Sequence, residues 1–308
     1  MADYDVVIIG SGVAGLTGAL FAARYGLSTL VLEANIPGGH LISIEKIEDF
    51  PGFPDGIAGY ELCPGLQHQA ADQGAEFQRA EVQSLKTQDH FWCVLTPDDQ
   101  HWTKAIIVAT GSTLKELGVP GEQRLTGKGV SHCASCDGPL YSGRTVGVVG
   151  GGDSALQEAL TLTNYAERIL IFDAAEHFSA QNVFRERTLR NAKIKPHHAT
   201  AVEEILGDEG VSGVRVRDLA TDEVSRIDLA GVFVYIGMTP NTTLLRNLLN
   251  LSGTGHVPTD GWMKTEREGL YAVGDIRQDS AAQAITSAGD GATAAIAAYR
   301  YIQTAFPK

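Results

Sequence analysis

One arrangement of strand, glycine-rich loop, helix and strand occurs twice in this chain, and its repetition restricts the fold more than any other feature. The first copy carries the loop GSGVAG at residues 10–15 and ends its second strand on Glu33. The second copy carries GGGDSA at 150–155 and ends its second strand on Asp173. In both copies the acid follows the first glycine of the loop by 23 residues. Because chance glycine runs do not reproduce such a register, the chain is predicted to contain two related nucleotide-binding units.

The residue types in both copies suit a dinucleotide. Glycines allow the tight turn and let the backbone approach a pyrophosphate, whose charge is stabilised at the N-terminus of the following helix. The carboxylate at the end of the second strand accepts hydrogen bonds from ribose hydroxyls. The sequence therefore predicts either two nucleotides or one flavin and one nicotinamide.

Further apolar segments indicate that the second unit is inserted into the first. Residues 106–112 and 232–238 are typical of buried strands that end in a turn, and 270–275 is a third strand that ends in a carboxylate. This third strand and a helix-like segment lie beyond the second copy, although they complete the first. We expect an α/β fold of two Rossmann-like, three-layer ββα domains. The expected domains are 1–117 with 245–308, and the inserted 118–244.

Cys133 and Cys136, in the sequence CASCDG, precede the second nucleotide unit. Two thiols separated by two residues can close and reopen a small disulfide ring, and Asp137 can exchange the proton that thiol chemistry requires. Half of a zinc site is the alternative, but no second cysteine pair or histidine pair follows at ligand spacing, so no metal is expected. Cys63 and Cys93 stand alone in a helix-like and a strand-like segment, and are expected to be buried thiols.

The composition excludes several classes of function. The net charge of −13 argues against binding to nucleic acid or to an anionic membrane surface. No apolar run approaches the roughly 18–20 residues that a transmembrane helix needs. An acidic start leads directly into the first strand, so no signal peptide is expected. These features favour a cytoplasmic protein.

Together the motifs resemble the low-molecular-weight thioredoxin reductase family of FAD-dependent disulfide oxidoreductases, the bacterial and plant type. The resemblance covers essentially the whole chain, and its further motifs are PGGHL at 37–41, EDFPGFPDGI at 48–57, ATGS at 109–112, GMTPNT at 237–242, GD at 274–275 and QAITSAGDG at 283–291. It implies an enzyme that exchanges electrons between FAD, the Cys133–Cys136 disulfide and a thioredoxin-like protein, and it implies a homodimer.

The resemblance also assigns residues to roles. The FAD site is expected at Gly10, Gly12, Val13, Ala14, Glu33, Gly39, His40, Leu41, Asp49, Ala109, Thr110, Gly111, Gly274, Asp275, Gln283 and Ala284. The second nucleotide site is expected at Gly150, Gly152, Asp153, Ser154 and Asp173. Cys136 would face the flavin, Cys133 would be the more exposed thiol that attacks the partner's disulfide, and Asp137 would donate and accept the proton.

The chain departs from the family where NADPH-using relatives carry arginines for the 2′-phosphate. Ala174 and Ala175 replace the paired arginines, and Ser179 replaces a later one. A phosphate would meet Asp173 instead of a cationic partner. NADPH is therefore disfavoured, and NADH is the preferred donor of the two. The stretch FDAAEHFSAQ is similar to that of the NADH-using flavoprotein subunit of alkyl hydroperoxide reductase.

Two other hypotheses remain open. The arginines for the 2′-phosphate are also absent from relatives that need no pyridine nucleotide and take electrons from ferredoxin or hold a second flavin. The basic residues Arg185, Arg187, Arg190, Lys193 and Lys195 would then form a patch for acidic ferredoxin, although such residues are more often a solvated helix face. The intact glycine loop at 150–155 argues against a complete loss of pyridine nucleotide binding. The third hypothesis is a flavin-binding redox sensor without turnover, which the cysteine pair disfavours.

Overall fold

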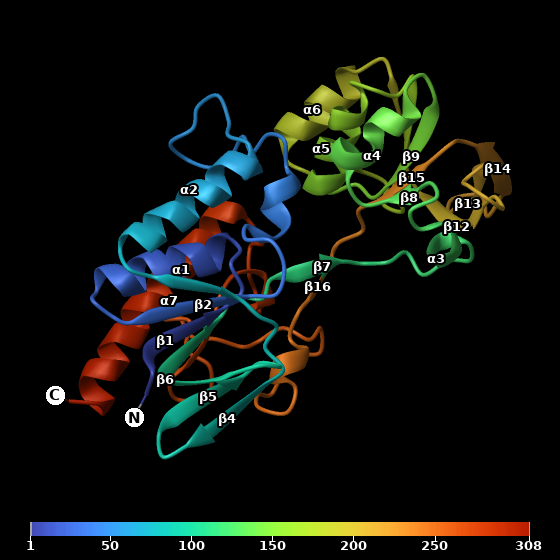
Figure 1. Ribbon diagram of the computed structural model, residues 1–308. Helices are drawn as coiled ribbons and strands as arrows, with labels where there is room; N and C mark the ends of the chain where they lie inside the picture. Colours follow the sequence, from blue (N-terminus) through green and yellow to red (C-terminus); the bar gives the residue numbers. More distant parts are fainter. Residues whose placement is uncertain (1, 308) are drawn as a thin grey trace. The chain divides into compact units, whose positions relative to one another are not determined.

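The computed structural model describes residues 2–307, which fall into two compact units (Figure 1). Unit 1 comprises Met1–Thr113 with Pro240–Lys308, and unit 2 comprises Leu114–Thr239. The chain passes between them through two short paired strands, Ser112–Leu114 (β7) and Met238–Pro240 (β16). The expected boundaries, after residues 117 and 244, lie four and five residues farther along the chain than the observed ones, because the division falls within these strands.

Unit 1 is built on a sheet with the strand order β3-β2-β1-β6-β5-β4, in which β17 also pairs with β6. Strands β3, β2, β1, β6 and β17 are parallel, whereas β4, β5 and the first half of β6 form an antiparallel meander. Their bounds are β1 Tyr4–Ile9, β2 Thr29–Glu33, β3 Glu76–Arg79, β4 Ser84–Gln88, β5 Phe91–Leu95, β6 Gln100–Val108 and β17 Leu270–Ala272.

Both faces of the parallel strands are buried, which explains their almost continuous apolar sequences. In β1, Val6 and Ile8 pack into one core while Val7 and Ile9 pack into another on the opposite face. Helices α1 (Val13–Arg24), α2 (Gly59–Asp72) and α7 (Ala284–Ala305) lie together on the first of these faces (Figure 1).

Helices α1 and α7 approach closely because small residues line their contact. A Cβ atom added to Gly291 of α7 would overlap the carbonyl oxygen of Ala14 in α1. One added to Gly18 would lie 3.4 Å from the carbonyl oxygen of Gly291. Buried alanines, including Ala294 and Ala298, continue this seam. The segment after the inserted unit is thereby fixed against the first helix of the chain.

Unit 2 repeats the parallel arrangement with the strand order β11-β10-β9-β15-β8. A separate antiparallel sheet, β12-β13-β14, adjoins it in the chain between β11 and β15. The bounds are β8 Val130–Ser131, β9 Thr145–Val149, β10 Arg168–Phe172, β11 Ile194–His197, β12 Thr200–Leu206, β13 Gly213–Asp218, β14 Val224–Asp228, β15 Val232–Val234, α3 Glu122–Leu125, α4 Ala134–Asp137, α5 Asp153–Leu162 and α6 Asn182–Arg190. Short 3₁₀ turns cover η1 Gly39–Ser43, η2 Gly138–Tyr141, η3 Thr243–Leu245 and η4 Gly274–Ile276.

The helix seam of unit 1 can be tested with two glycines of the same helix. We expect Gly291→Ala to lower the free energy of unfolding by about 1–3 kcal/mol, since the added methyl group overpacks the contact with α1. Gly289 is exposed, and no atom lies within 4 Å of the position that a Cβ would take there. Gly289→Ala should therefore raise the free energy by about 0.5–1 kcal/mol through helix propensity. Urea unfolding of both variants checks this, and equal effects would contradict the proposed packing constraint.

Candidate functional site

The first glycine loop connects β1 to α1 and leaves one position open to a ligand. Gly10 has a φ of +98°, and a Cβ there would overlap the carbonyl oxygen of Ala109. A Cβ on Gly15 would overlap the carbonyl oxygen of Gly10, so the helix must start directly against the loop. At Gly12 no atom lies within 4 Å of the Cβ position, and its φ of −65° suits any residue. This open space beside a helix N-terminus is where a pyrophosphate fits.

Glu33, at the end of β2, is held by the loop itself. The backbone N–H and the hydroxyl of Ser11 both donate to Oε2 of Glu33, each at 2.8 Å. The backbone N–H of Asn35 donates to Oε1 at 2.9 Å. A carboxylate can accept further hydrogen bonds, so these contacts fix the orientation of Glu33 without saturating it. Ser11 is a site residue that the motif does not identify, because its role requires the side chain geometry.

The remaining predicted FAD residues of unit 1 also gather at the carboxyl ends of parallel strands. Gly39, His40 and Leu41 form η1, which packs on the loop because the N–H of Gly38 donates to the carbonyl oxygen of Ser11 at 2.9 Å. Ala109, Thr110 and Gly111 follow β6, Gly274 and Asp275 follow β17, and Gln283 and Ala284 begin α7 together with the Val13–Ala14 start of α1. Asp49 is exposed in the loop between η1 and α2.

Asp275 and His40 influence each other across this edge. Burial raises the pKa of Asp275, and a hydrogen bond from the Ser287 hydroxyl at 3.4 Å and the proximity of His40 oppose that shift. Burial lowers the pKa of His40, and the charge of Asp275 opposes this. The pair offers one acceptor and one titratable ring to a ligand at the strand ends.

Two structural clamps in this region were not predicted. Asn241 joins the segment after β6, because its Nδ2 donates to the carbonyl oxygen of Thr110 at 3.0 Å and the Thr110 hydroxyl donates to the Asn241 carbonyl oxygen at 2.7 Å. Asp290 of α7 accepts from the N–H of Gly274 at 3.1 Å and from Nε of Arg277 at 3.0 Å. Except for Arg277, the residues of these clamps lie in the quoted motifs, but the motifs do not show which of their residues pair with one another.

The second glycine loop, between β9 and α5, has the same backbone but a different environment for its acid. Gly150 has a φ of +127°, and a Cβ there would overlap the carbonyl oxygen of Tyr235. Gly152 again faces open space, with only the Ser179 hydroxyl oxygen near its Cβ position, at 3.9 Å. Gly151 stands where the first loop has Ser11, and a Cβ at this position would overlap the carboxylate of Asp173.

Asp173 is consequently buried with one free acceptor. The residue is 8% exposed, and Oδ1 accepts from the N–H of Ala175 at 3.1 Å, whereas Oδ2 has no hydrogen-bond partner. A buried carboxylate oxygen without a donor is costly, and a ribose hydroxyl supplies such a donor. The residues present therefore fit a nucleotide with a free ribose hydroxyl at this position.

The other predicted residues of the second site flank this carboxylate. Asp153 begins α5, and its two oxygens accept from the backbone N–H and the side chain of Gln181 at 2.7 and 3.2 Å. Ser154 follows it in the first turn of the helix. Ala174 and Ala175 are exposed, and the stretch from Asp173 to Ser179 contains no lysine or arginine.

Cys133 and Cys136 form a disulfide in unit 2. Cys133 caps the short helix α4, and its Sγ accepts from the N–H of Cys136 at 3.2 Å. The expectation that Cys133 is the more exposed cysteine is wrong for this structure, because Cys136 is exposed and Cys133 is half-buried. The reason is the cap: Ser131 lies beside Cys133 and accepts its N–H at 3.1 Å, while Cys136 occupies the outer turn. Asp137 ends α4 and is also half-buried.

The two remaining cysteines are buried thiols, as expected. Burial raises the pKa of Cys63 to about 11 and also raises the pKa of Cys93, so neither is a reactive thiolate near neutral pH. Within the described part of the chain, no group of three or more His, Cys, Asp and Glu side chains is arranged to hold a metal ion.

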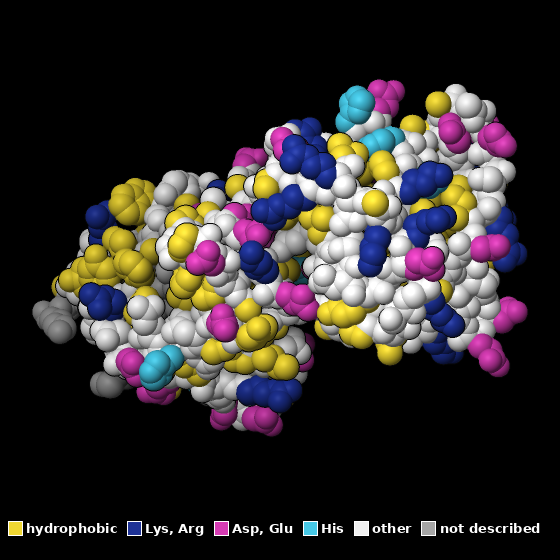
Figure 2. Space-filling model, turned by 90° about the horizontal axis from the view of Figure 1, so that it is seen from above, with side chains coloured by type: hydrophobic (Ala, Val, Ile, Leu, Met, Phe, Trp, Pro, Cys, Tyr) yellow, Lys and Arg dark blue, Asp and Glu magenta, His cyan; other side chains and the backbone are white. Residues whose placement is uncertain are grey.

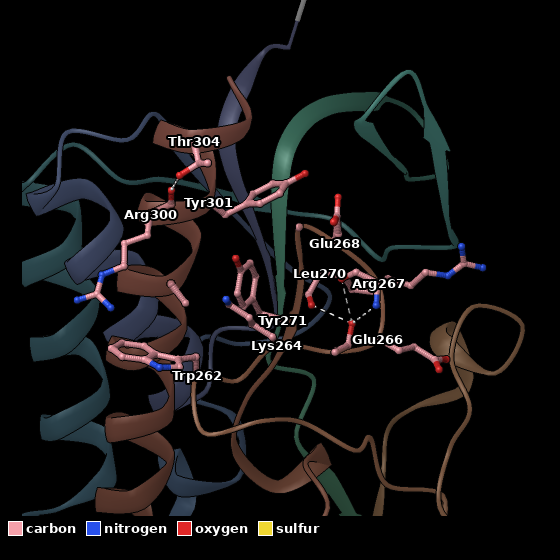
Figure 3. A pocket seen from close by; sticks show the side chains of 13 residues that line it. Trp262, Lys264, Glu266, Arg267, Glu268, Leu270, Tyr271, Arg300, Tyr301 and Thr304 are labelled. Atoms are coloured by element: carbon pink, nitrogen blue, oxygen red, sulfur yellow. Dashed lines mark hydrogen bonds between the residues drawn. The ribbon is translucent and has the colours of Figure 1, made fainter. Parts of the chain in front are cut away.

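A cavity of about 480 Å³ in unit 1 lies apart from these residues (Figure 3). Its lining includes Lys264, Tyr271 and Trp262 together with Arg300 and Tyr301 of α7, and the Arg300 guanidinium lies 4.4 Å from the centre of the Trp262 ring. The cavity lies at the start of β17, whereas the glycine loops follow the ends of strands. It therefore belongs to the opposite end of the sheet from the nucleotide residues.

The basic residues around α6 are engaged in local contacts. Arg190 pairs with Glu186 at 3.0 Å, and Nζ of Lys193 donates to the carbonyl oxygen of Thr163 at 2.7 Å. Arg185 donates to the neighbouring Asn182 side chain. The face seen in Figure 2 carries basic and acidic side chains intermixed. No helix of residues 2–307 combines the length and apolarity needed to cross a membrane.

Known proteins with similar sequences and structures share this architecture. Residues 4–291 match the family model described as pyridine nucleotide-disulphide oxidoreductase. The thioredoxin reductase of Mycolicibacterium smegmatis is 40% identical over 97% of this chain and 96% of its own length. The structure of Lactococcus lactis thioredoxin reductase (FR conformation) is 36% identical, with a TM-score of 0.96 over 98% of this chain and 100% of that one. A ferredoxin-flavin thioredoxin reductase from Clostridium acetobutylicum is 26% identical, with a TM-score of 0.53 over 98% of each chain.

These matches extend over both glycine loops and the cysteine pair, and they agree with the α/β fold of the two units. The chain therefore belongs to the pyridine nucleotide-disulphide oxidoreductase family, and within it to the thioredoxin reductases.

Proposed function

We propose that this protein is an NADH-dependent reductase of a thioredoxin-like protein. Membership of the thioredoxin reductases makes it an FAD-dependent disulfide oxidoreductase. The proposal adds the donor and the division of labour: unit 1 binds FAD, while unit 2 binds NADH and carries the Cys133–Cys136 disulfide. By family resemblance, we further propose a cytoplasmic homodimer.

The observation that carries the choice of donor is the carboxylate of Asp173. Its Oδ2 is buried without a partner and lies against Gly151, where a side chain would displace it. A ribose 2′-hydroxyl can donate to this oxygen, whereas a 2′-phosphate brings negative charge against it. With Ala174, Ala175 and Ser179 in place of arginines, that charge has no compensating partner in this stretch.

The expected discrimination is large. A hydrogen bond to a charged group contributes about 1.5–3 kcal/mol, and about 1.4 kcal/mol corresponds to a tenfold change in affinity. The absence of two or three such bonds weakens NADPH by several orders of magnitude relative to a site that has the arginines. NADPH is consequently a poor donor.

A donor other than a pyridine nucleotide is the second candidate. The absence of the arginines favours a ferredoxin-dependent or diflavin enzyme as much as it favours NADH. Two features argue against this second candidate, because both suit a dinucleotide. They are the open position at Gly152 and the unpartnered oxygen of Asp173. The local contacts of Arg190 and Lys193 also reduce the charge available to an acidic partner.

The residues of the two units then have distinct tasks. When bound, FAD supplies the two-electron link between the nicotinamide and the disulfide. Glu33 and Asp275 bind hydroxyls of the cofactor, and Gly12 leaves room for its pyrophosphate. Reduction of the Cys133–Cys136 disulfide consumes two electrons and two protons, one of which Asp137 relays. The Cys133 thiolate attacks the partner's disulfide, and Cys136 then attacks the mixed disulfide and releases the reduced partner.

FAD binding to unit 1 can be tested at the open glycine. We expect Gly12→Val to remove bound FAD, because the side chain would fill the pyrophosphate space, and no protein atom lies within 4 Å of its Cβ position. The apo forms of the variant and the parent should unfold at the same urea concentration. Gly65→Ala, in α2 with no atom within 4 Å of its Cβ position, serves as the control that keeps the flavin. Flavin absorbance per chain is the measurement, and a full complement of FAD in Gly12→Val would refute the assignment.

The roles of the two cysteines can be separated by single substitutions. Cys133→Ser and Cys136→Ser should each abolish reduction of a thioredoxin-like protein, since neither variant can close the ring. Cys93→Ser should retain activity, because Cys93 is buried in β5. If Cys136 faces the flavin, Cys133→Ser shows a long-wavelength thiolate–flavin absorbance that Cys136→Ser lacks. Undiminished turnover in Cys136→Ser would exclude the disulfide mechanism. If only Cys136→Ser shows the thiolate–flavin absorbance, then Cys133 faces the flavin and Cys136 attacks the partner.

The choice of donor can be tested by restoring the missing charge. Ala174→Arg with Ala175→Arg should raise the ratio of kcat/KM for NADPH to that for NADH at least tenfold, while the parent is reduced faster by NADH. Ala220→Arg with Thr221→Arg adds the same charge to an exposed turn of unit 2 and should leave the ratio unchanged. Anaerobic flavin bleaching gives the rates. Rapid reduction of the parent by micromolar NADPH contradicts the proposal, and reduction by ferredoxin alone selects the second candidate.

A further inference from the structure

A carboxylate from the nucleotide-binding helix contacts the turn that carries the redox-active cysteines. Glu158 lies in α5, the helix that follows the second glycine loop. Its Oε2 accepts the backbone N–H of Ala134 at 3.0 Å. Ala134 is fully buried and directly follows Cys133 in the CASC sequence. The contact therefore ties the first residue of α4 to α5.

The same oxygen of Glu158 has a second donor from a third element. The hydroxyl of Tyr235, which directly follows β15, donates to Oε2 at 3.3 Å. Tyr235 is 5% exposed, and burial together with the charge of Glu158 raises its pKa far above the usual range. The tyrosine is thus a permanent donor, and the carboxylate joins α4, α5 and the end of β15.

The position of this charge matters because Glu158 holds the N–H of Ala134, the residue directly after Cys133, and reduction of the disulfide creates a thiolate in the same turn. Cys133 gains thiolate stabilisation from the N–H of Cys136, which already points at its Sγ. A carboxylate near the same turn has the opposite effect, since like charges disfavour the ionised thiol. Glu158 also occupies the N–H of Ala134, which is then not available to the sulfur.

The other charged and titratable groups of this region come from neighbouring elements. Burial raises the pKa of both Tyr141 in η2 and Tyr235, and the charge of Asp137 in α4 adds to both shifts, whereas Arg144 opposes the shift at Tyr141. His132 precedes the turn, and its Nδ1 lies 3.0 Å from the carbonyl oxygen of Val234. Of these groups, Glu158 is the one that holds the backbone of the turn directly.

We propose that Glu158 is a positioning residue that fixes the redox-active turn through Ala134 and whose negative charge shifts the equilibrium of Cys133 and Cys136 toward the disulfide. The dithiol is thereby a stronger reductant for its partner. This inference rests on the proposed role of the two cysteines. It concerns their equilibrium, so it can be tested without a nicotinamide or a partner protein.

The test is equilibration of the FAD-loaded protein with glutathione redox buffers, followed by alkylation and mass measurement of Cys133 and Cys136. Glu158→Gln keeps an oxygen that can accept the N–H of Ala134 but removes the charge. At pH 8.5, where thiolate is populated, we expect a threefold to tenfold shift toward the dithiol, tenfold being about 30 mV. At pH 6 the shift should be smaller, because the thiols are then protonated and respond less to a neighbouring charge.

Glu167→Gln is the matched control, since Glu167 is an exposed acid of the same unit, directly before β10. Its equilibrium constant should equal that of the parent. If Glu158→Gln does not fold, Tyr235→Phe takes its place: the hydroxyl donates to the ionised carboxylate and stabilises it, so its loss disfavours the charge of Glu158, and the shift should again be toward the dithiol but smaller.

An equilibrium constant for Glu158→Gln within twofold of the parent at both pH values overturns the inference, as does an equal shift in the control. A parent protein whose cysteines do not respond to the redox buffers overturns the proposed function itself. The two failures are therefore distinguishable.

Discussion

The close backbone contact at the first glycine of each loop is the constraint on which both units depend. In unit 1 the carbonyl oxygen of Ala109, after β6, lies against Gly10, and in unit 2 the carbonyl oxygen of Tyr235, after β15, lies against Gly150. Only a residue without Cβ can occupy these places, since any side chain would overlap the carbonyl oxygen of the neighbouring strand end. With these strand ends held so close, the open glycine and the acid of the next strand lie at the same edge of the sheet. A dinucleotide site follows from this packing before any ligand-specific residue is considered.

The two loops have the same backbone conformation, but their acids have different hydrogen-bond partners. The residue after the first glycine of each loop, Ser11 or Gly151, accounts for this difference. Ser11 gives Glu33 two donors, whereas Gly151 gives Asp173 space and no donor from its side chain. The first acid is thus oriented in advance by the protein. The second still needs a partner, which a ligand can supply. In the proposed function, the site with the oriented acid is the one for FAD, and the site with the unpartnered acid is the one for the nicotinamide.

The sequence was sufficient to predict the repeated units, the insertion and the strand ends at which site residues gather, because glycine spacing and apolar runs are local signals. It was not sufficient for contacts that depend on the assembled fold. The clamp between Asn241 and Thr110 joins residues 131 positions apart. The exposure of Cys136 depends on the capping of α4 by Cys133, which the CASC motif alone does not specify. The Glu158 contact escaped prediction for the same reason, since an acid in mid-helix resembles a solvated side chain.

The insertion of unit 2 has a consequence for biosynthesis. Strand β17 and helix α7, which complete the core of unit 1, leave the ribosome after unit 2, although their neighbours β6 and α1 emerge before it. Unit 2 is contiguous, so it can fold while the first 113 residues still lack their closing helix. During that interval the apolar face of α1 that meets Gly291 is uncovered. During synthesis, the earlier segment of unit 1 therefore exposes apolar surface that the complete fold buries, until α7 emerges.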